Sequence, residues 1–442
     1  MRRRTFIQSA VLGPALAGAA FGGEGSTTEA LPLVANDFVK VYESPDALQV
    51  FSYSPGLAVL PGGRLVATLD LNGPAYAGKT GIDAYRGRIY TSDDRGQTWT
   101  IRASTPMIHA RPFVAGDAVY VLGHRGDLGI VRSTDSGATW GEVSWLTERE
   151  HWHQAPCNVH YANGRVYLVM EKDTDPSLPV WPVSVLAPVV MAANVTDDLT
   201  RRDAWTFSNA LSYRDAIAAA GPPHLLGVPF FTPGNTAPEN AKIRRPMAPP
   251  GWLETNVVQF VDPNHVWHDP AGRTFHLWMR AHTGSTNLAA IARAVESEDG
   301  SLTVSLEHAP SGEPMLFVPC PGGQMKFHIV YDEKTTLFWL LSSQATDSMT
   351  RPDRLTDDRF DLPNNERHRL VLHFSKNCVD WCFAARVADS KAYGQARHYA
   401  SMAIDGDDLH VLSRSGDERA KSAHDGNIIT FHTVRHFRDL VY

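Results

Sequence analysis

The sequence predicts an all-β fold built from repeated four-stranded antiparallel units. Strand pairs recur around tight Gly, Asn or Asp turns, and one eight-residue motif occurs twice, 41 residues apart, starting at Ser92 and Ser133. No long stretch shows the 3.6-residue apolar period of an amphipathic helix. The chain has 442 residues, of which 43% are apolar and 20% charged. This is enough apolar material for one large core.

The first thirty residues differ from the rest. Arg2-Arg3-Arg4 precedes Phe6, an Ala-rich apolar stretch runs to Ala20, and Ala17-Gly18-Ala19 offers a cleavage site. This order is typical of a signal peptide, and the paired arginines resemble a twin-arginine export signal. An ordinary secretory signal or a retained anchor is the alternative. We expect a signal over 1–30 and one domain over 31–442, exported to the periplasm or secreted.

Charge and hydropathy limit the partners. The net charge is −7, and no basic run occurs, so nucleic acid is not expected as a partner. After the signal, no apolar stretch is long enough to span a membrane. We expect a monomer that acts on an acidic polysaccharide or oligosaccharide.

Six strand–turn–strand copies are visible along the chain. Turns of this composition between β-branched and aromatic runs are typical of hairpins. The copies are Leu57–Thr68, Arg111–Leu122, Asn158–Glu171, Val266–Arg280, Phe327–Ser342 and Tyr399–Ser413.

The repeated motif is Ser-x-Asp-x-Gly-x-Thr-Trp, at Ser92–Trp99 and Ser133–Trp140. Its Ser and Asp bond the turn backbone, Gly permits a left-handed conformation, and Trp packs between sheets. It resembles the Asp-box of sialidase-like β-propellers, and worn copies follow at Ser375–Trp381 and Asp197–Trp205. The resemblance implies a single β-propeller of four-stranded antiparallel blades. The box is a structural turn and does not indicate activity.

The number of blades is less certain from spacing alone. The interval between the turns near 164 and 272 is about double its predecessors, which leaves room for one blade more than the six visible hairpins. We favour seven blades over six, because the relatives that the chain resembles have seven. The strand Phe38–Glu43 is expected to close the ring by pairing into the last blade.

Blade topology sorts the loops onto two faces, and the face opposite the Asp-box turns is expected to carry the ligand. This face is rich in Arg and His, which attract an anionic ligand, and Arg matches carboxylate geometry. Carboxylates such as Glu171 and Glu254 are fewer there. The expected substrate-binding residues are His109, Arg111, Asn256, Arg280, Lys326, Arg397, Tyr399, Arg414 and His424.

A mouth rich in His, Tyr and Arg favours β-elimination at a uronate. Arg neutralises the carboxylate, a base near neutral pKa removes the C5 proton, and an acid donates to the leaving oxygen. The segments His151–Pro156, Gly251–Asn256 and Ser413–Asn427 resemble propeller polysaccharide lyases, including ulvan lyases and lyases of L-rhamnose-α-1,4-D-glucuronate, and related α-L-rhamnosidases. The resemblance implies a lyase whose catalytic residues are His124, His153, Tyr213 and Arg245.

Two other functions remain open. A glycoside hydrolase would act on the same rhamnose–glucuronate linkage as an α-L-rhamnosidase, or as an exo-α-sialidase, and Glu254 would be central to such hydrolysis. A sialidase needs three arginines, a Tyr–Glu nucleophile pair and an Asp acid, but Phe51–Leu57 lacks the expected first arginine. The third alternative is a non-catalytic carbohydrate-binding propeller.

The chemistry requires no cofactor, but a structural zinc ion is a further hypothesis. His265, His282, Cys320 and His328 come from neighbouring strands near one blade junction, and mixed His and Cys ligands suit Zn²⁺. No tight ligand spacing supports it, and scattered histidines beside a buried cysteine are the favoured alternative.

Overall fold

The computed structural model describes residues 31–220, 248–283, 287–346, 366–390, 392 and 395–442. Contacts divide the chain into Met1–Pro32 and Leu33–Tyr442, and the second unit holds all the elements below. None of the helices in the described residues is both long and apolar enough to cross a membrane.

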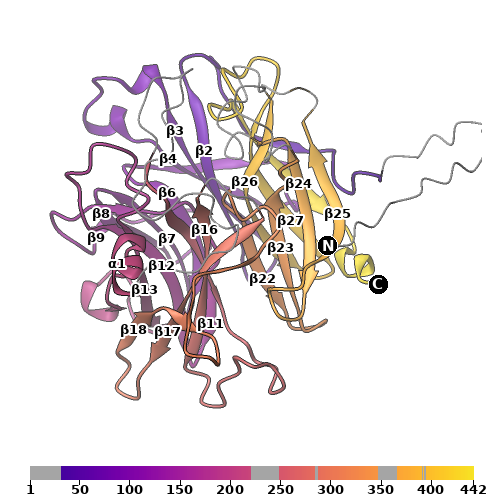
Figure 1. Ribbon diagram of the computed structural model, residues 1–442. Helices are drawn as coiled ribbons and strands as arrows, with labels where there is room; N and C mark the ends of the chain where they lie inside the picture. Colours follow the sequence, from indigo (N-terminus) through magenta and orange to yellow (C-terminus); the bar gives the residue numbers. More distant parts are fainter. Residues whose placement is uncertain (1–30, 221–247, 284–286, 347–365, 391, 393–394) are drawn as a thin grey trace, which may run out of the picture. The chain divides into compact units, whose positions relative to one another are not determined.

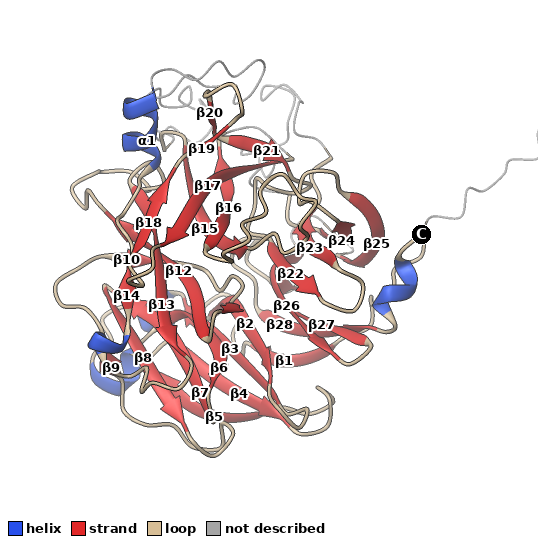
Figure 2. Ribbon diagram, turned by 90° about the horizontal axis from the view of Figure 1, so that it is seen from below, coloured by secondary structure: helices blue, strands red, loops and turns tan. Residues whose placement is uncertain are grey.

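Antiparallel sheets arranged around a common axis make up this unit (Figures 1 and 2). Blade 1 contains β2 (Phe51–Val59), β3 (Leu65–Asn72), β4 (Gly87–Ser92) and β5 (Thr100–Thr105). Blade 2 contains β6 (Ile108–Ala115), β7 (Ala118–Arg125), β8 (Asp127–Ser133) and β9 (Ser144–Trp145). Blade 3 contains β10 (Trp152–His153), β11 (His160–Ala162), β12 (Arg165–Asp173), β13 (Leu186–Asn194) and β14 (Thr206–Phe207).

The second half of the chain repeats the pattern. Blade 4 contains β15 (Gly251–Val258), β16 (Thr274–His282), β17 (Leu288–Glu296) and β18 (Leu302–Ser305), with β21 (Phe317–Pro319) paired to β17. Blade 5 contains β22 (His328–Asp332), β23 (Leu337–Ser343), β24 (Arg369–Ser375) and β25 (Cys382–Asp389). Blade 6 contains β26 (Ala396–Asp405), β27 (Asp408–Gly416), β28 (Ile428–Val434) and β1 (Val39–Glu43).

Few other elements occur in the described residues. They are the pair β19 (Glu307–His308) and β20 (Pro314–Met315), the helix α1 (Tyr213–Ala220), and 3-10 turns at Pro74–Tyr76, Gly81–Ala84, Arg202–Ala204 and Phe437–Leu440.

The described residues form six blades, so the seventh that the spacing favoured is not found among them. The long interval between turns holds the outer strands of blade 3, α1 and β15. The expected strand from Val266 is also not formed. Asp262 and Asp269 accept backbone N–H bonds two residues ahead, from Asn264 and Ala271, and these turns keep the segment irregular.

The expected closing strand is confirmed. β1 pairs antiparallel with β28, with Val39 opposite Phe431 and Glu43 opposite Ile428 (Figure 2). The first strand of the domain therefore completes its last blade.

Both Asp-boxes fold as their sequence predicts. The Ser133 hydroxyl accepts the Gly137 N–H at 2.8 Å, and the Asp135 carboxylate accepts the Thr139 N–H at 2.9 Å. Arg64, in the turn between β2 and β3, bonds Asp93 at 2.5 Å and the Ser136 carbonyl at 3.1 Å. The box turns and the first hairpin turn therefore share one face, opposite the expected mouth.

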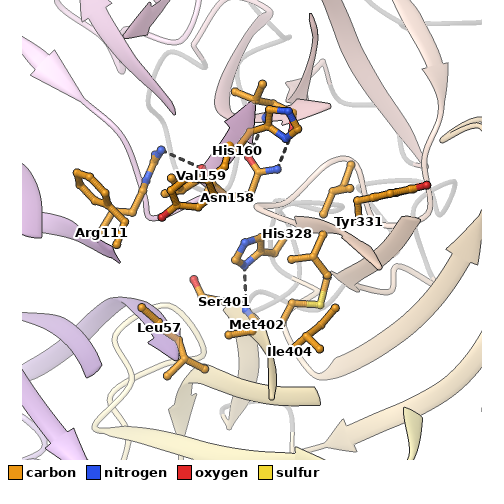
Figure 3. Close-up of a pocket in the computed structure, with 18 of the residues that line it drawn as sticks. Leu57, Arg111, Asn158, Val159, His160, His328, Tyr331, Ser401, Met402 and Ile404 are labelled. Carbon is orange, nitrogen blue, oxygen red and sulfur yellow. Dashed lines mark hydrogen bonds between the residues drawn. The ribbon is translucent and has the colours of Figure 1, made fainter. Parts of the chain in front are cut away.

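The side chain of Thr68 on β3, and side chains on or beside the innermost strands of blades 2 to 6, join the blades into a closed ring, which we call the interblade belt. Each hydrogen bond links one blade to the next, and the last returns from blade 6 to blade 1. The links are Thr68 Oγ1 to Ala110 O (2.6 Å), Arg111 Nη1 to Asn158 O (3.1 Å), Asn158 Nδ2 to Val257 O (2.7 Å), Asn256 Nδ2 to Phe327 O (3.2 Å), Met402 N to His328 Nδ1 (2.9 Å) and Ser401 Oγ to Pro55 O (2.8 Å). Figure 3 shows the Arg111 and His328 links.

Gly96, in the first Asp-box, is expected to be required for packing against Phe431 as well as for the turn. Gly96 has φ +85°, and an added Cβ would lie 2.1 Å from the buried Phe431 ring. Gly63 also has φ +85°, but nothing lies within 4 Å of its Cβ position. Gly63→Ala should therefore cost only the backbone penalty, about 1 kcal/mol. Gly96→Ala should add an overpacking cost of about 1–3 kcal/mol.

Urea unfolding of both variants measures this difference. Equal losses of unfolding free energy would show that Phe431 moves aside freely, contrary to the expectation.

Candidate active site

A cavity of about 290 Å³ opens at the mouth, where the innermost strands begin. Its chemistry-bearing lining residues are Tyr53, Asp70, Arg86, His109, His153, Trp181, Glu254, Tyr399, Arg414 and His424. A larger cavity of about 660 Å³ lies at the opposite end of the same strands (Figure 3). Aliphatic residues such as Leu57 and Ile404 contribute much of the wall of this second cavity, whereas ionisable groups are concentrated at the mouth.

Bulges in four innermost strands direct side chains into the mouth. Ser54, His109, Glu254 and Tyr399 have φ of 40°, 52°, 60° and 50°. At each of these positions the pairing with the second strand of the blade shifts register. A non-glycine residue in this region is strained, and bulges commonly re-aim side chains at functional sites. Three of the four residues carry groups suited to catalysis.

Arg280 joins Tyr399 to Glu254. Its Nη1 lies 2.6 Å from the Tyr399 hydroxyl oxygen and 3.4 Å from Glu254 Oε2, while its Nε donates to the Gln324 carbonyl at 2.8 Å. All three side chains are buried. Burial raises the pKa of Tyr399 to about 12, a shift opposed by Arg280 and increased by the charge of Glu254. The phenol is therefore neutral at physiological pH and has a carboxylate beside it.

Three guanidinium groups surround the Tyr399 ring. The Cζ atoms of Arg280, Arg367 and Arg414 lie 6.0, 5.6 and 5.3 Å from its centroid. Burial lowers the pKa of Arg367 to about 10, which still leaves it charged near neutral pH. We call these residues the arginine group. Concentrated positive charge in a partly enclosed site favours an anionic ligand.

Asp70, at the mouth end of β3, supplies a second carboxyl group. It is 3% exposed and accepts the His109 backbone N–H at 3.0 Å. Burial raises the pKa of Asp70 to about 7, although the His109 N–H and Arg414 oppose the shift. A carboxyl group with this pKa can donate a proton near neutral pH.

His109, His124 and His153 form a histidine group on the wall from blades 2 and 3. His109 Nδ1 lies 3.2 Å from His124 Nε2, and the ring centroids are 5.3 to 5.8 Å apart. Burial lowers the pKa of all three imidazoles, that of His124 to about 3. They are therefore neutral hydrogen-bonding groups at physiological pH.

The structure separates the expected site residues into two sets. The mouth brings together His109, His124, His153, Arg280, Tyr399, Arg414 and His424. The other expected site residues that the structure describes form hydrogen bonds within or between blades instead. Arg111 and Asn256 belong to the interblade belt, and Lys326 Nζ donates to the Ala400 carbonyl at 2.6 Å. Arg397 donates to the Ala396 and Gly416 carbonyls.

The expected lyase set is only partly assembled. His124 and His153 lie together, but Tyr213 packs at right angles against Trp252 in the core, with centroids 5.4 Å apart. Tyr213 is not among the residues that line the mouth cavity. Arg245 lies outside the described residues.

The predicted zinc site is wrong for these residues. Within the described part of the chain, no three His, Cys, Asp or Glu side chains are placed to hold a metal ion. His265 stacks on Phe260 at 3.9 Å, His282 contacts Trp181, Cys320 is buried in an apolar cluster, and His328 serves the interblade belt. Aromatic and belt contacts thus direct these side chains apart.

Sequence reasoning missed Asp70, Arg367 and Trp181. Asp70 lies two residues beyond the first expected hairpin, Leu57–Thr68, on β3, and strand direction alone places that end of the strand at the mouth. Arg367 precedes β24 and Trp181 lies between β12 and β13, in segments without a recognisable motif.

No family model and no curated protein matches the chain. Solved structures do match. An α-L-arabinanase from Penicillium chrysogenum is 11% identical with a TM-score of 0.50, over 92% of this chain and 99% of that one. The Hadza microbial sialidase Hz136 is 14% identical with a TM-score of 0.52, over 90% and 68%. A Trypanosoma rangeli sialidase is 12% identical with a TM-score of 0.51, over 91% and 60%. At these identities the likeness establishes the fold: the chain is a β-propeller of the kind found in these structures.

Proposed function

We propose that the protein is a retaining glycoside hydrolase that releases a terminal acidic sugar, a nonulosonic or hexuronic acid. The observation that carries this proposal is the contact of one Arg280 nitrogen with both Tyr399 and Glu254, which line the same cavity as Asp70. The structural likeness to sialidases and an arabinanase supports a carbohydrate-active propeller.

The choice of nucleophile follows from charge. An acidic sugar would repel an attacking carboxylate, whereas the neutral Tyr399 phenol can approach it. Glu254, held beside Tyr399 by Arg280, can take the phenol proton during attack. The arginine group pairs with the sugar carboxylate and stabilises charge that develops in the transition state.

The proposed reaction has two steps. In the first, Tyr399 Oη attacks the anomeric carbon as Glu254 accepts the phenol proton, and the glycosidic C–O bond breaks while Asp70 gives its proton to the departing oxygen. In the second, water attacks the anomeric carbon and the bond to Tyr399 Oη breaks, while Asp70 takes a proton from the water and Glu254 returns its proton to Tyr399. Arg280 stabilises the phenol oxygen in both steps.

The site departs from the sialidase arrangement at one point. Phe51–Leu57 has no arginine, and the third cation near Tyr399 is Arg414 of β27, whose Cζ lies 4.0 Å from the Tyr53 ring centroid. We therefore leave the acidic sugar broader than sialic acid. We place the reaction outside the cytoplasm because of the export signal expected in residues 1–30.

β-Elimination is the second candidate, because the histidine group supplies neutral imidazoles that could remove a proton. Ultraviolet absorbance of an unsaturated uronate would indicate elimination. Release of a saturated acidic sugar would indicate hydrolysis.

Substitution of the nucleophile pair tests the hydrolase proposal. Tyr399→Phe and Glu254→Gln should each lower kcat by about 10²–10⁴-fold, because the attacking oxygen or its proton acceptor is lost. A slow fluorinated substrate should label the wild-type protein at Tyr399, as read by peptide mass spectrometry. The matched control is Tyr331→Phe, in the cavity at the other end of the axis, which should retain full activity. Unchanged turnover in folded Tyr399→Phe would reject the mechanism.

The pH profile tests the role of Asp70. Its protonated form is the active acid, so kcat/KM should fall as pH rises through about 7. A glycosyl fluoride, whose leaving group needs no proton, should show no such decline. Asp70→Asn should impair alkyl glycosides far more than the fluoride. If kcat/KM fell equally with rising pH for both substrates, the ionisation responsible would belong to a group other than Asp70.

A further inference from the structure

The lining of the mouth cavity is divided by charge. Blades 4 to 6 contribute Glu254, Tyr399, Arg414 and His424 to the lining. Arg280 and Arg367 flank the Tyr399 ring without lining the cavity themselves. The lining residues from blades 2 and 3 are Ile108, His109, His153, Ala155 and Trp181, none of which has a fixed charge. Arg86 lines the cavity from blade 1, beside Asp70, so the uncharged wall is confined to blades 2 and 3.

Trp181 is an aromatic platform at this uncharged wall. Trp181 is 41% exposed, although it lies between β12 and β13 at the edge of a buried site. The His282 ring meets it at 87° with centroids 5.0 Å apart, and the Arg280 Cζ lies 5.5 Å from its centroid. The Val183 N–H donates to the Trp181 carbonyl at 3.0 Å. These contacts hold the ring in place while part of its surface stays open.

The position of the acid shows which wall the leaving group meets. Asp70 accepts the His109 backbone N–H, so a glycosidic oxygen protonated by Asp70 lies beside His109. The acidic sugar occupies the side of the cavity lined by Tyr399 and Arg414. The group that leaves with the oxygen is then directed toward blades 2 and 3.

We propose that Trp181, His109 and His153 form a leaving-group subsite for a neutral sugar ring. Trp181 packs against the C–H face of the ring, and the two imidazoles bond its hydroxyl groups. The inference rests on the proposed function and deepens it. The enzyme removes a terminal acidic sugar from a neutral one, because no Arg or Lys side chain lines the cavity from blades 2 and 3 to pair with a second acidic ring.

The test compares substrates that share the acidic sugar but differ in the leaving group. N-acetylneuraminyl fluoride is paired with sialyllactose, and glucuronyl fluoride with glucuronyl-galactose. Fluoride is too small to reach Trp181. Trp181→Ala should lower kcat/KM for the glycan substrate by on the order of tenfold more than for the fluoride. His153→Ala should likewise lower kcat/KM more for the glycan substrate than for the fluoride.

Trp145→Ala is the matched control, because Trp145 is 46% exposed on β9 and does not line the cavity. It should leave both substrates unchanged. Equal loss on both substrates in Trp181→Ala, or no loss on either, would overturn the subsite. Wild-type turnover of a disaccharide with an acidic leaving ring, as fast as that with a neutral one, would also overturn it. Wild-type turnover of neither fluoride nor disaccharide would instead reject the hydrolase itself.

Discussion

The interblade belt is the constraint on which the mouth depends. Neighbouring blades do not share backbone ladders, so the inner edge of each sheet would otherwise leave polar groups unpaired. The belt pairs these groups across every junction. In three blades the belt residue follows the bulged residue by two positions: Arg111 after His109, Asn256 after Glu254, and Ser401 after Tyr399. The hydrogen bond of the belt residue therefore also fixes the direction of the bulged side chain two positions before it.

This arrangement explains how a strained and highly charged site persists. A buried ion pair such as Arg280–Glu254 is costly to desolvate and returns that cost only with good geometry and further hydrogen bonds. The Gln324 carbonyl and the Tyr399 hydroxyl supply those bonds to Arg280. Dipoles and charges are thus oriented before substrate arrives, which is the main requirement for electrostatic catalysis.

Local patterns were sufficient for the Asp-boxes, most hairpins and the closing strand, because each depends on nearby residues or a simple alternation. The side chains of the site were harder to assign. Alternation places Glu254 and Asn256 on the same side of a strand. The bulge between them sends Glu254 to the mouth and Asn256 to the next blade. Sequence predicts Arg111 and Lys326 as ligand-binding residues because it cannot show that carbonyls of a neighbouring strand accept their hydrogen bonds. The described residues form six blades and not the seven that spacing favours, because spacing does not distinguish a blade from α1 and its connections.

The pairing of β1 with β28 has a consequence for synthesis of the chain. β1 leaves the ribosome first among the strands, and its partner leaves last. Until then β1 is an unpaired edge that could associate with other chains. Its sequence Val39–Glu43 also carries Lys40 and Glu43, charges that oppose such association. The ring can therefore close only after β28, and with it almost the whole domain, has been translated.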